Sequence, residues 1–274
     1  MTNEVCTFAA PLAKRTARAA VMSLVTLSLL MGLGCGGSGS NATNAPITPS
    51  ANVFREDFNG TTLDSSVWQV AGWAEHGGQT SPERCYAKDG FLTMEFKNDS
   101  AYYAAHQLYL SSALQTRATF LYGRWEARLK PSSVSGVLNS FYTIDWGNGN
   151  GTKQEIDIEF LTKSFGSGAG EVHYAVHAEG KTSFNTNPDV PLPFDPSADF
   201  HIYGIEITPT EIKWTVDGTL MKTYTYSPSG VTITAPYQLK LNAWSQTNWI
   251  GGPPVANTVC TYLIDWIQFT PRAQ

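Results

Sequence analysis

Three acidic residues alternate with apolar residues in the segment 153–161, KQEIDIEFL. Glu155, Asp157 and Glu159 are separated by isoleucines, which is the two-residue period of a β-strand. On such a strand the acids share one face, and neighbouring acids lie about 7 Å apart because a strand rises roughly 3.3 Å per residue. The row is either the solvated face of an antiparallel strand or a set of carboxyl groups gathered for chemistry.

Cleavage of a glycosidic bond needs such a set, because one carboxylate attacks the sugar while one carboxylic acid protonates the leaving oxygen. Retaining enzymes hold the two groups about 5–5.5 Å apart. The Cα atoms of Glu155 and Glu159 lie about 13 Å apart on a straight strand, and glutamates that lean together on a concave strand close most of that distance. Asp157 can hydrogen-bond one glutamate and, by its charge, help to raise the pKa of the acid. The segment therefore favours glycoside hydrolysis.

The rest of the chain must supply the sheet that positions this strand. Strand patterns recur, and no convincing helical period runs between them. Asp217-Gly218 supplies a hairpin-turn signal. The pattern predicts an all-β fold, an antiparallel β-sandwich. The expected strands span 91–96, 121–130, 171–178, 200–208, 211–218, 237–244 and 262–270.

Composition and the N-terminal segment indicate an exported protein. The net charge of −5, with no basic stripe, argues against a nucleic-acid partner. Residues 1–34 contain basic residues followed by an apolar run, which predicts a secretory signal. Cys35 follows that run as in the lipobox of bacterial lipoproteins, so a lipid anchor is expected; the alternative is ordinary cleavage nearby. Residues 35–52 are predicted to form a flexible linker. Residues 53–272 are predicted to form one catalytic domain, and the protein is expected to be a monomer.

The E-I-D-I-E motif resembles the active-site signature of glycoside hydrolase family 16. The resemblance covers most of 54–270, through LYGRWEARLKP, SSVSGVLNSFYT, FDPSADFHIYGIEITPTEIKWTVDG and LNAWSQTNWIGG in the family's order. It implies a concanavalin A-like jelly roll with a concave polysaccharide cleft, and retaining endo-hydrolysis or transglycosylation of β-linked glucans or galactans without a cofactor. It also implies that Glu155 is the nucleophile, Glu159 the acid/base and Asp157 the assisting carboxylate.

The linkage that is cleaved is less clearly indicated. The unbulged motif is similar to that of lichenases, which cut β-1,3-1,4-glucan, and of xyloglucan-active enzymes. Where lichenases carry cleft residues, however, this chain has Ala113, Gln115, Lys153, Ala175 and His177. The expectation is hydrolysis of β-1,3-1,4- or β-1,3-glucan. The alternatives are a xyloglucan-type transglycosylase and a non-catalytic carbohydrate-binding jelly roll.

Several aromatic and polar residues are predicted to contact the sugar. Trp244 and Trp249 match sugar-stacking positions of the family, and Asn242 is a hydrogen-bonding neighbour. Trp146 lies just before the motif and could supply the ring that is missing at Lys153. Only one of Phe141 and its neighbour can face the cleft. The predicted substrate contacts are Trp244, Asn242, Trp249, Trp146, His177 and Phe141.

Three further features bear on metals and cysteines. His173 and His177 share a strand face, but no third zinc ligand is evident, so a cleft hydrogen-bonding role is favoured for His177. The resemblance implies a structural calcium held by the Asp265 side chain and by main-chain carbonyls at Asp57 and Gly90. Two cysteines within the domain, Cys85 and Cys260, could form a disulfide or remain separate buried thiols.

Overall fold

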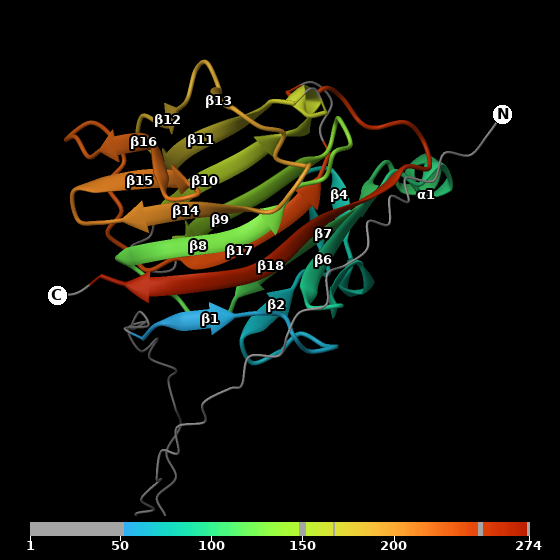
Figure 1. Ribbon diagram of the computed structural model, residues 1–274, viewed down its shortest axis with the longest axis horizontal. Coiled ribbons are helices and arrows are strands. Elements are labelled where there is room, and N and C mark those ends of the chain that lie inside the picture. Colours follow the sequence, from blue (N-terminus) through green and yellow to red (C-terminus); the bar gives the residue numbers. More distant parts are fainter. Residues whose placement is uncertain (1–51, 148–151, 167, 246–248, 273–274) are drawn as a thin grey trace, which may run out of the picture. The chain divides into compact units, whose positions relative to one another are not determined.

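The computed structural model describes residues 52–147, 152–166, 168–245 and 249–272 (Figure 1). The predicted signal at 1–34, the predicted lipid-anchor residue Cys35 and all of the predicted linker except Asn52 lie outside the described residues. Among the described residues, no helix has the length and apolar character needed to cross a bilayer.

The described chain is built almost entirely from β-strands, which form two sheets. Sheet A contains β1 (Phe54–Glu56), β5 (Cys85–Lys88), β6 (Phe91–Lys97), β8 (Gly123–Lys130), β14 (His201–Ile207), β15 (Glu211–Val216), β16 (Thr219–Thr225) and β18 (Val259–Pro271). Sheet B contains β2 (Trp68–Val70), β7 (Tyr109–Thr116), β9 (Leu138–Trp146), β10 (Lys153–Leu161), β11 (Gly170–Ala178), β12 (Phe184–Asn185), β13 (Val190–Leu192) and β17 (Gln238–Trp244).

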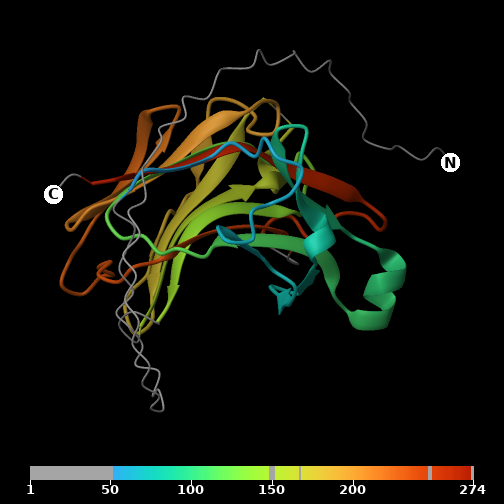
Figure 2. The ribbon, with the colours of Figure 1, turned by 90° about the horizontal axis from the view of Figure 1, so that it is seen from below.

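The strand order places the acidic strand in the middle of sheet B. That order is β2–β7–β17–β9–β10–β11, with β12 and β13 on the outer edge of β11. A short hairpin, β3 (Ala74–Glu75) and β4 (Gly78–Thr80), joins β7 through the parallel β4–β7 pair. All other pairs are antiparallel, and β7 also pairs with β6, so it links the two sheets. The two sheets curve over each other (Figure 2), which confirms the predicted sandwich.

One face of each sheet supplies the core. Trp125 on β8 and Ile205 on β14 pack with Ile158 on β10, and all three are fully buried in one cluster. Each such side chain contributes about 1.5–3 kcal/mol by leaving water. Because successive side chains on a strand point to opposite sides, the residues of sheet B between these core positions lie on the other face, which we call the outer face of sheet B.

The predicted strands are confirmed, but one helix was not foreseen. Asp217 and Gly218 form the turn between β15 and β16 with φ angles of 48° and 77°, the left-handed values of a type I′ hairpin. Helix α1 (Ser100–His106) begins after Asp99, whose carboxylate accepts hydrogen bonds from the backbone N–H groups of Ala101 and Tyr102. The helix is too short to produce a recognisable 3.6-residue period. Two 3₁₀ turns, Pro82–Arg84 and Thr162–Ser164, complete the described elements.

The two domain cysteines are separate thiols. Cys85 on β5 is opposite Met94 on β6, and Met94 is opposite Tyr262 on β18, two residues beyond Cys260. Two strand spacings alone place their backbones about 10 Å apart, beyond the reach of a disulfide, whose Cα atoms lie up to about 6.8 Å apart. Burial raises the pKa of the Cys85 thiol, so it behaves as a small apolar side chain.

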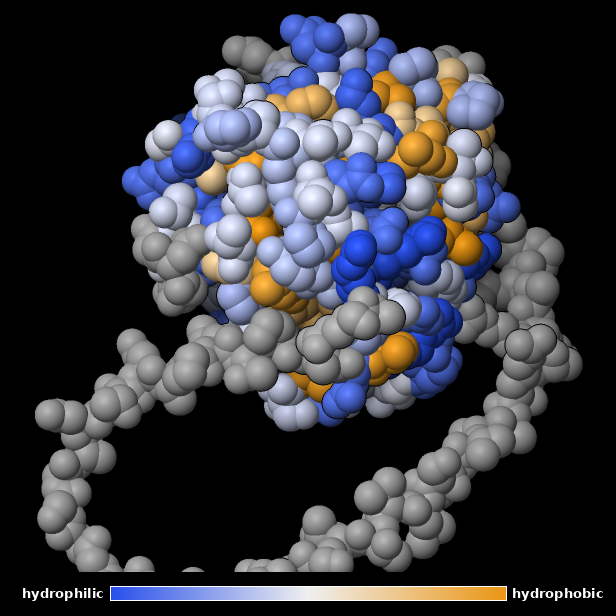
Figure 3. Space-filling model, turned by 90° about the vertical axis from the view of Figure 1, so that its left-hand side faces the viewer, coloured by the Kyte–Doolittle hydropathy of each residue, from blue (hydrophilic) through white to orange (hydrophobic). Residues whose placement is uncertain are grey.

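On the face of the molecule seen in Figure 3, hydrophobic residues appear as separate patches between hydrophilic ones. Exposed large apolar side chains among the described residues are scattered along the chain rather than concentrated in one segment. Isolated exposed apolar residues are normal on a soluble surface.

Candidate active site

The acidic row lies on the outer face of sheet B, as its alternation predicts. Ile156 and Ile158 are 1 % and 0 % exposed and belong to the core. Glu155, Asp157 and Glu159 therefore point away from the core, along a strand that is paired on both edges. A strand held by β9 and β11 keeps the three carboxyl groups on one face without help from a loop.

Glu155 is the member of the row with a cation beside it. Its Oε2 lies 2.7 Å from the Nζ of Lys153, and its side chain is 19 % exposed. Lys153 is two residues earlier on the same strand, so it shares the outer face with the acids. The ammonium of Lys153 thus lies against the carboxyl group that is predicted to attack the sugar.

Glu159 has the properties of a proton donor. Burial, followed by the charges of Glu155 and Asp189, raises the pKa of Glu159 to about 8. It therefore carries a proton at neutral pH and can give it to a leaving oxygen. Burial and the charges of both glutamates also hold the pKa of Asp157 well above its usual range, against the opposing effect of Lys153. Negative charges in one desolvated row repel one another, so the three carboxyl groups cannot all be ionised together. The row therefore keeps protons that can pass between neighbouring carboxyl groups.

The floor beside the acids is polar and comes from β9 and β17. Tyr142 is opposite Asp157 in the β9–β10 register and is 4 % exposed. Burial and the charges of Glu75, Glu155 and the other two acids raise the pKa of its hydroxyl, which places it among the carboxyl groups. Asn242 donates to the Tyr142 hydroxyl at 3.4 Å and accepts a hydrogen bond from Ser140. Asn242 thus lies on the predicted face as part of a hydrogen-bonded floor, 3 % exposed.

Phe141 was predicted to face the substrate, and this prediction is wrong. It is 0 % exposed and is opposite Ile158 and Leu241, which are both core residues. Only one of two successive residues can point outward, and on β9 that residue is Tyr142. The pairing register, which the sequence of one strand does not contain, decides between them.

Two histidines continue the outer face onto β11. His177 is opposite Glu155; its Nε2 lies 3.7 Å from Oδ2 of Asp157, and its Nδ1 lies 2.9 Å from the Ser183 hydroxyl. His173 is opposite Glu159, and its Nδ1 lies 2.7 Å from Asp189. Across the described ranges, no group of three or more His, Cys, Asp or Glu side chains could hold a metal. His177 thus lies on the same face as the acids, and its hydrogen bond to the sugar stays a prediction.

The predicted aromatic contacts differ in how open they are. Trp146 is 50 % exposed and is opposite Lys153, whose Nζ lies 5.1 Å from the centre of the indole, so a ring does stand beside Lys153. Trp249 packs against a small apolar cluster and meets His173 edge to face. Trp244 is only 8 % exposed, and His76 stacks on its ring at 4.7 Å. The expectation that Trp244 offers an open stacking face is therefore corrected.

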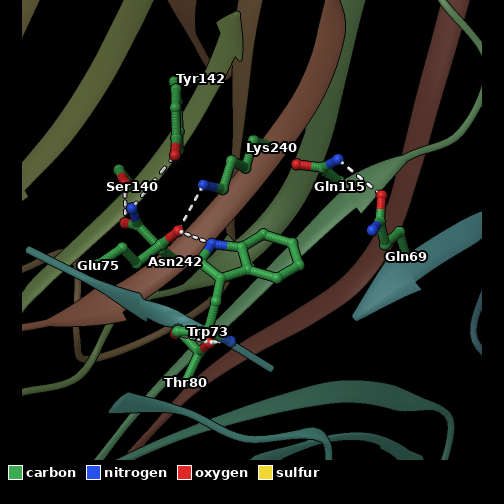
Figure 4. A network of polar contacts seen from close by, with 9 residues as sticks. All are labelled: Gln69, Trp73, Glu75, Thr80, Gln115, Ser140, Tyr142, Lys240 and Asn242. Carbon is green, nitrogen blue, oxygen red and sulfur yellow. Dashed lines mark hydrogen bonds and ion pairs between the residues drawn. The ribbon is translucent and has the colours of Figure 1, made fainter. Parts of the chain in front are cut away.

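A buried ion pair on the same face was not predicted. Lys240 on β17 is 2 % exposed, and its Nζ lies 2.8 Å from Oε2 of Glu75 on β3. Trp73 Nε1 donates to the same carboxylate oxygen at 3.0 Å, so three side chains converge beside Tyr142 (Figure 4). A lysine between two leucines in the strand segment YQLKLNAW was the available signal, but its partner lies 165 residues away in the chain.

We expect Glu75→Gln to lower the free energy of unfolding by about 3–5 kcal/mol, because it leaves the ammonium of Lys240 buried without its counter-charge. The double variant Glu75→Gln/Lys240→Met should recover most of that loss, since it removes both charges. Urea unfolding of the two variants measures the difference. Equal destabilisation of the single and double variants would show that packing, not charge, holds the hairpin.

The strand register brings the predicted calcium ligands to one part of β18, and the two carboxylates among them are paired with arginines. Asp265 lies at a bulge in β18, is 3 % exposed, and is 2.7 Å from Nη1 of Arg128. Asp57 follows β1 and Gly90 precedes β6, and both strands pair with β18 on either side of Asp265. The Asp57 carboxylate binds Arg55 at 2.6 Å, which leaves its main-chain carbonyl as the relevant group.

The central strand of this antiparallel β-sandwich carries one protonated glutamate and one glutamate that is paired with a cation. A glycoside-cleaving enzyme needs two such carboxyl groups. Comparison with known proteins identifies the class. The sequence profile of "Glycosyl hydrolases family 16" matches residues 80–268. The chain belongs to this family and is a glycoside hydrolase.

Individual relatives agree with the family. The chain is 34 % identical over 231 residues to a protein named "Beta-glucanase" from Paenibacillus macerans, covering 81 % of this chain and 89 % of the relative. It is 33 % identical over 158 residues to the "Beta-glucanase" of Bacillus subtilis, covering 56 % of this chain and 60 % of that protein. A solved structure titled as a β-1,3-1,4-glucanase (lichenase) from a mouse hindgut metagenome is similar with a TM-score of 0.66 and 27 % identity, covering 80 % and 99 % of the two chains.

Proposed function

We propose that the protein is an endo-acting, retaining β-glucanase that cleaves β-1,3-1,4- or β-1,3-linked glucan by double displacement. The observation that carries this proposal is the division of roles along β10, where Glu159 has a pKa of about 8 and Glu155 is paired with Lys153. The names of the relatives, "Beta-glucanase" in both sequences, support a glucan as the substrate.

In the proposed reaction, Glu155 attacks the anomeric carbon while Glu159 protonates the departing glycosidic oxygen. This step leaves a glycosyl ester on Glu155 and an ionised Glu159. Glu159 then takes a proton from a water molecule, which attacks the same carbon and releases the sugar with its configuration retained. Asp157 holds a proton between the two glutamates, which limits the repulsion when either of them is charged.

The test is a panel of soluble polysaccharides: barley β-glucan, lichenan, laminarin and xyloglucan, each assayed for new reducing ends. We expect release of oligosaccharides from at least one of the first three. Binding without product would indicate a carbohydrate-binding jelly roll. Longer products from xyloglucan with labelled acceptor oligosaccharides would indicate a transglycosylase.

We also propose a structural calcium at Asp265, with main-chain carbonyls of Asp57 and Gly90 as further ligands. The convergence of these segments at the β18 bulge supports it, and oxygen ligands suit this hard cation. The ion would stabilise the fold and take no part in the chemistry.

We expect millimolar calcium to raise the Tm of the chelator-treated protein by a few degrees, and Asp265→Asn to abolish that increase. Calorimetry with magnesium as the control ion measures the shift. An unchanged Tm, with Arg128 remaining the partner of Asp265, would refute the site.

We propose that the protein is exported and held in the cell envelope by a lipid on Cys35, and that it acts as a monomer. The basic and apolar segment before Cys35 and the Gly/Ser-rich stretch after it support export and tethering. The exposed large apolar side chains of the described residues are scattered along the chain, which supports the monomer.

We expect Cys35→Ser to move the protein from the membrane fraction to the soluble fraction of the producing bacterium. Fractionation followed by immunoblotting checks this result, and sedimentation of the purified domain checks the monomer. Membrane association that survives the substitution would contradict the lipid anchor.

A further inference from the structure

The hairpin β3–β4 stands on the outer face of sheet B next to the acid row. Two contacts attach it to β17: the ion pair from Glu75 to Lys240 at 2.8 Å and the stacked rings of His76 and Trp244. Trp73 adds a hydrogen bond to Glu75 from the same segment (Figure 4). The hairpin is therefore fixed to the sheet by charge and by ring packing.

His76 is held at the tip of this hairpin by backbone geometry. His76 and Gly77 connect β3 to β4 with φ angles of 49° and 74°, the left-handed values that a two-residue type I′ turn requires at both positions. A turn of this kind has little freedom once both strands are paired. The imidazole is thus presented to Trp244 by a rigid support.

The imidazole covers the ring face that a sugar would use. The indole of Trp244 packs with Leu138, Leu161 and Ile250, and its remaining exposure is 8 %. His76 lies parallel to the indole, with an interplanar angle of 22° and a centroid distance of 4.7 Å. A pyranose ring stacks on indole through its flat C–H face, so the imidazole and a sugar ring would compete for this place.

The same imidazole is close to the catalytic acids. Burial lowers the pKa of His76, and the charges of Glu75 and Glu155 oppose that effect while Lys240 and Lys153 add to it. Lys240, the partner of Glu75, is opposite Tyr142 on β9, and Tyr142 is opposite Asp157 on β10. The residue that precedes His76 is therefore attached to the sheet two strands from the acids, a spacing of about 10 Å.

We propose that His76 blocks the stacking face of Trp244, so that the β3–β4 hairpin ends the substrate-binding surface at β17. The proposal rests on the proposed function, because it names the limit of the same binding site. The enzyme accordingly binds fewer sugar units on the β17 side of the acids than an open Trp244 would allow, and fragments from that side are short.

The first test does not depend on activity. Acrylamide quenching of tryptophan fluorescence is compared between the unchanged protein and His76→Ala, each with and without Trp244→Phe. We expect the quenching assigned to Trp244 by difference to rise at least about twofold in His76→Ala. His106→Ala is the matched control, because His106 also stacks on an aromatic ring, that of Tyr102, in the exposed helix α1.

The second test measures binding. Calorimetry follows β-1,3-1,4- and β-1,3-gluco-oligosaccharides of increasing length in a Glu155→Gln background. When His76 is present, the affinity should stop increasing at a shorter oligosaccharide than it does in His76→Ala. In His76→Ala it should increase for at least one further unit, by about three- to tenfold for a newly stacked ring.

Each outcome decides the proposal. Unchanged quenching in His76→Ala, or the same limiting length with and without the imidazole, overturns it. If the unchanged protein neither binds nor cleaves any glucan, the proposed function fails. The quenching experiment still decides whether the hairpin covers Trp244.

Discussion

Glu155→Ala should lower kcat on soluble β-glucan by about 10⁴-fold or more, because the residue that forms the covalent intermediate is removed. Added azide should restore turnover, since this small anion fits the space left by the carboxylate and attacks the same carbon. The rescued product is a glycosyl azide of inverted configuration, because only one displacement takes place. Nuclear magnetic resonance of the first product identifies the configuration.

Glu83→Ala serves as the control for this experiment, because Glu83 is an exposed carboxylate in the 3₁₀ turn Pro82–Arg84, which precedes β5 of sheet A. It should keep its full activity and show no response to azide. A rescued product of retained configuration would falsify the assignment of Glu155 as nucleophile.

Glu159→Gln should lower kcat by about 10²–10⁴-fold while polysaccharide binding survives, because the amide keeps the shape but cannot give up a proton. For the unchanged enzyme, kcat/KM should fall as pH rises through about 8, since the raised pKa of Glu159 keeps the acid protonated below that value and ionised above it. The variant should lose this alkaline limb. Rate measurements between pH 5 and 10 test both statements.

Glu159→Gln should also change how the free energy of unfolding depends on pH, which can be measured without substrate. The folded protein holds a proton on Glu159 up to about pH 8, whereas the unfolded chain releases it at the ordinary glutamate pKa. The free energy of unfolding therefore decreases as pH rises between those two values. Relative to the unchanged protein, Glu159→Gln should be more stable at pH 9 than at pH 5. An alkaline limb that persists in the variant would assign the acid role to Asp157.

The central strand could be predicted because its information is local. Alternating acids and isoleucines in 153–161 determine both the strand and the face on which the acids lie, and the structure places them there. The hairpin at Asp217-Gly218 was predictable for the same reason, since two successive residues carry the turn.

The remainder of the site depends on contacts that are distant in the chain. Phe141 and Tyr142 look alike in sequence, and only the register with β10 separates the core residue from the outer one. His76 covers Trp244, and Glu75 forms an ion pair with Lys240. Both covering residues lie far earlier in the sequence than their partners. No periodicity or motif within one strand reports such pairings.

Because β9 and β11 hold the acid-bearing strand along both of its edges, the reacting groups are assembled in the folded protein before any glucan arrives. The conformational entropy of the acid-bearing strand is therefore lost during folding rather than in each catalytic cycle. Heat should therefore leave the catalytic geometry intact until the sheet itself melts, so that loss of activity and global unfolding coincide.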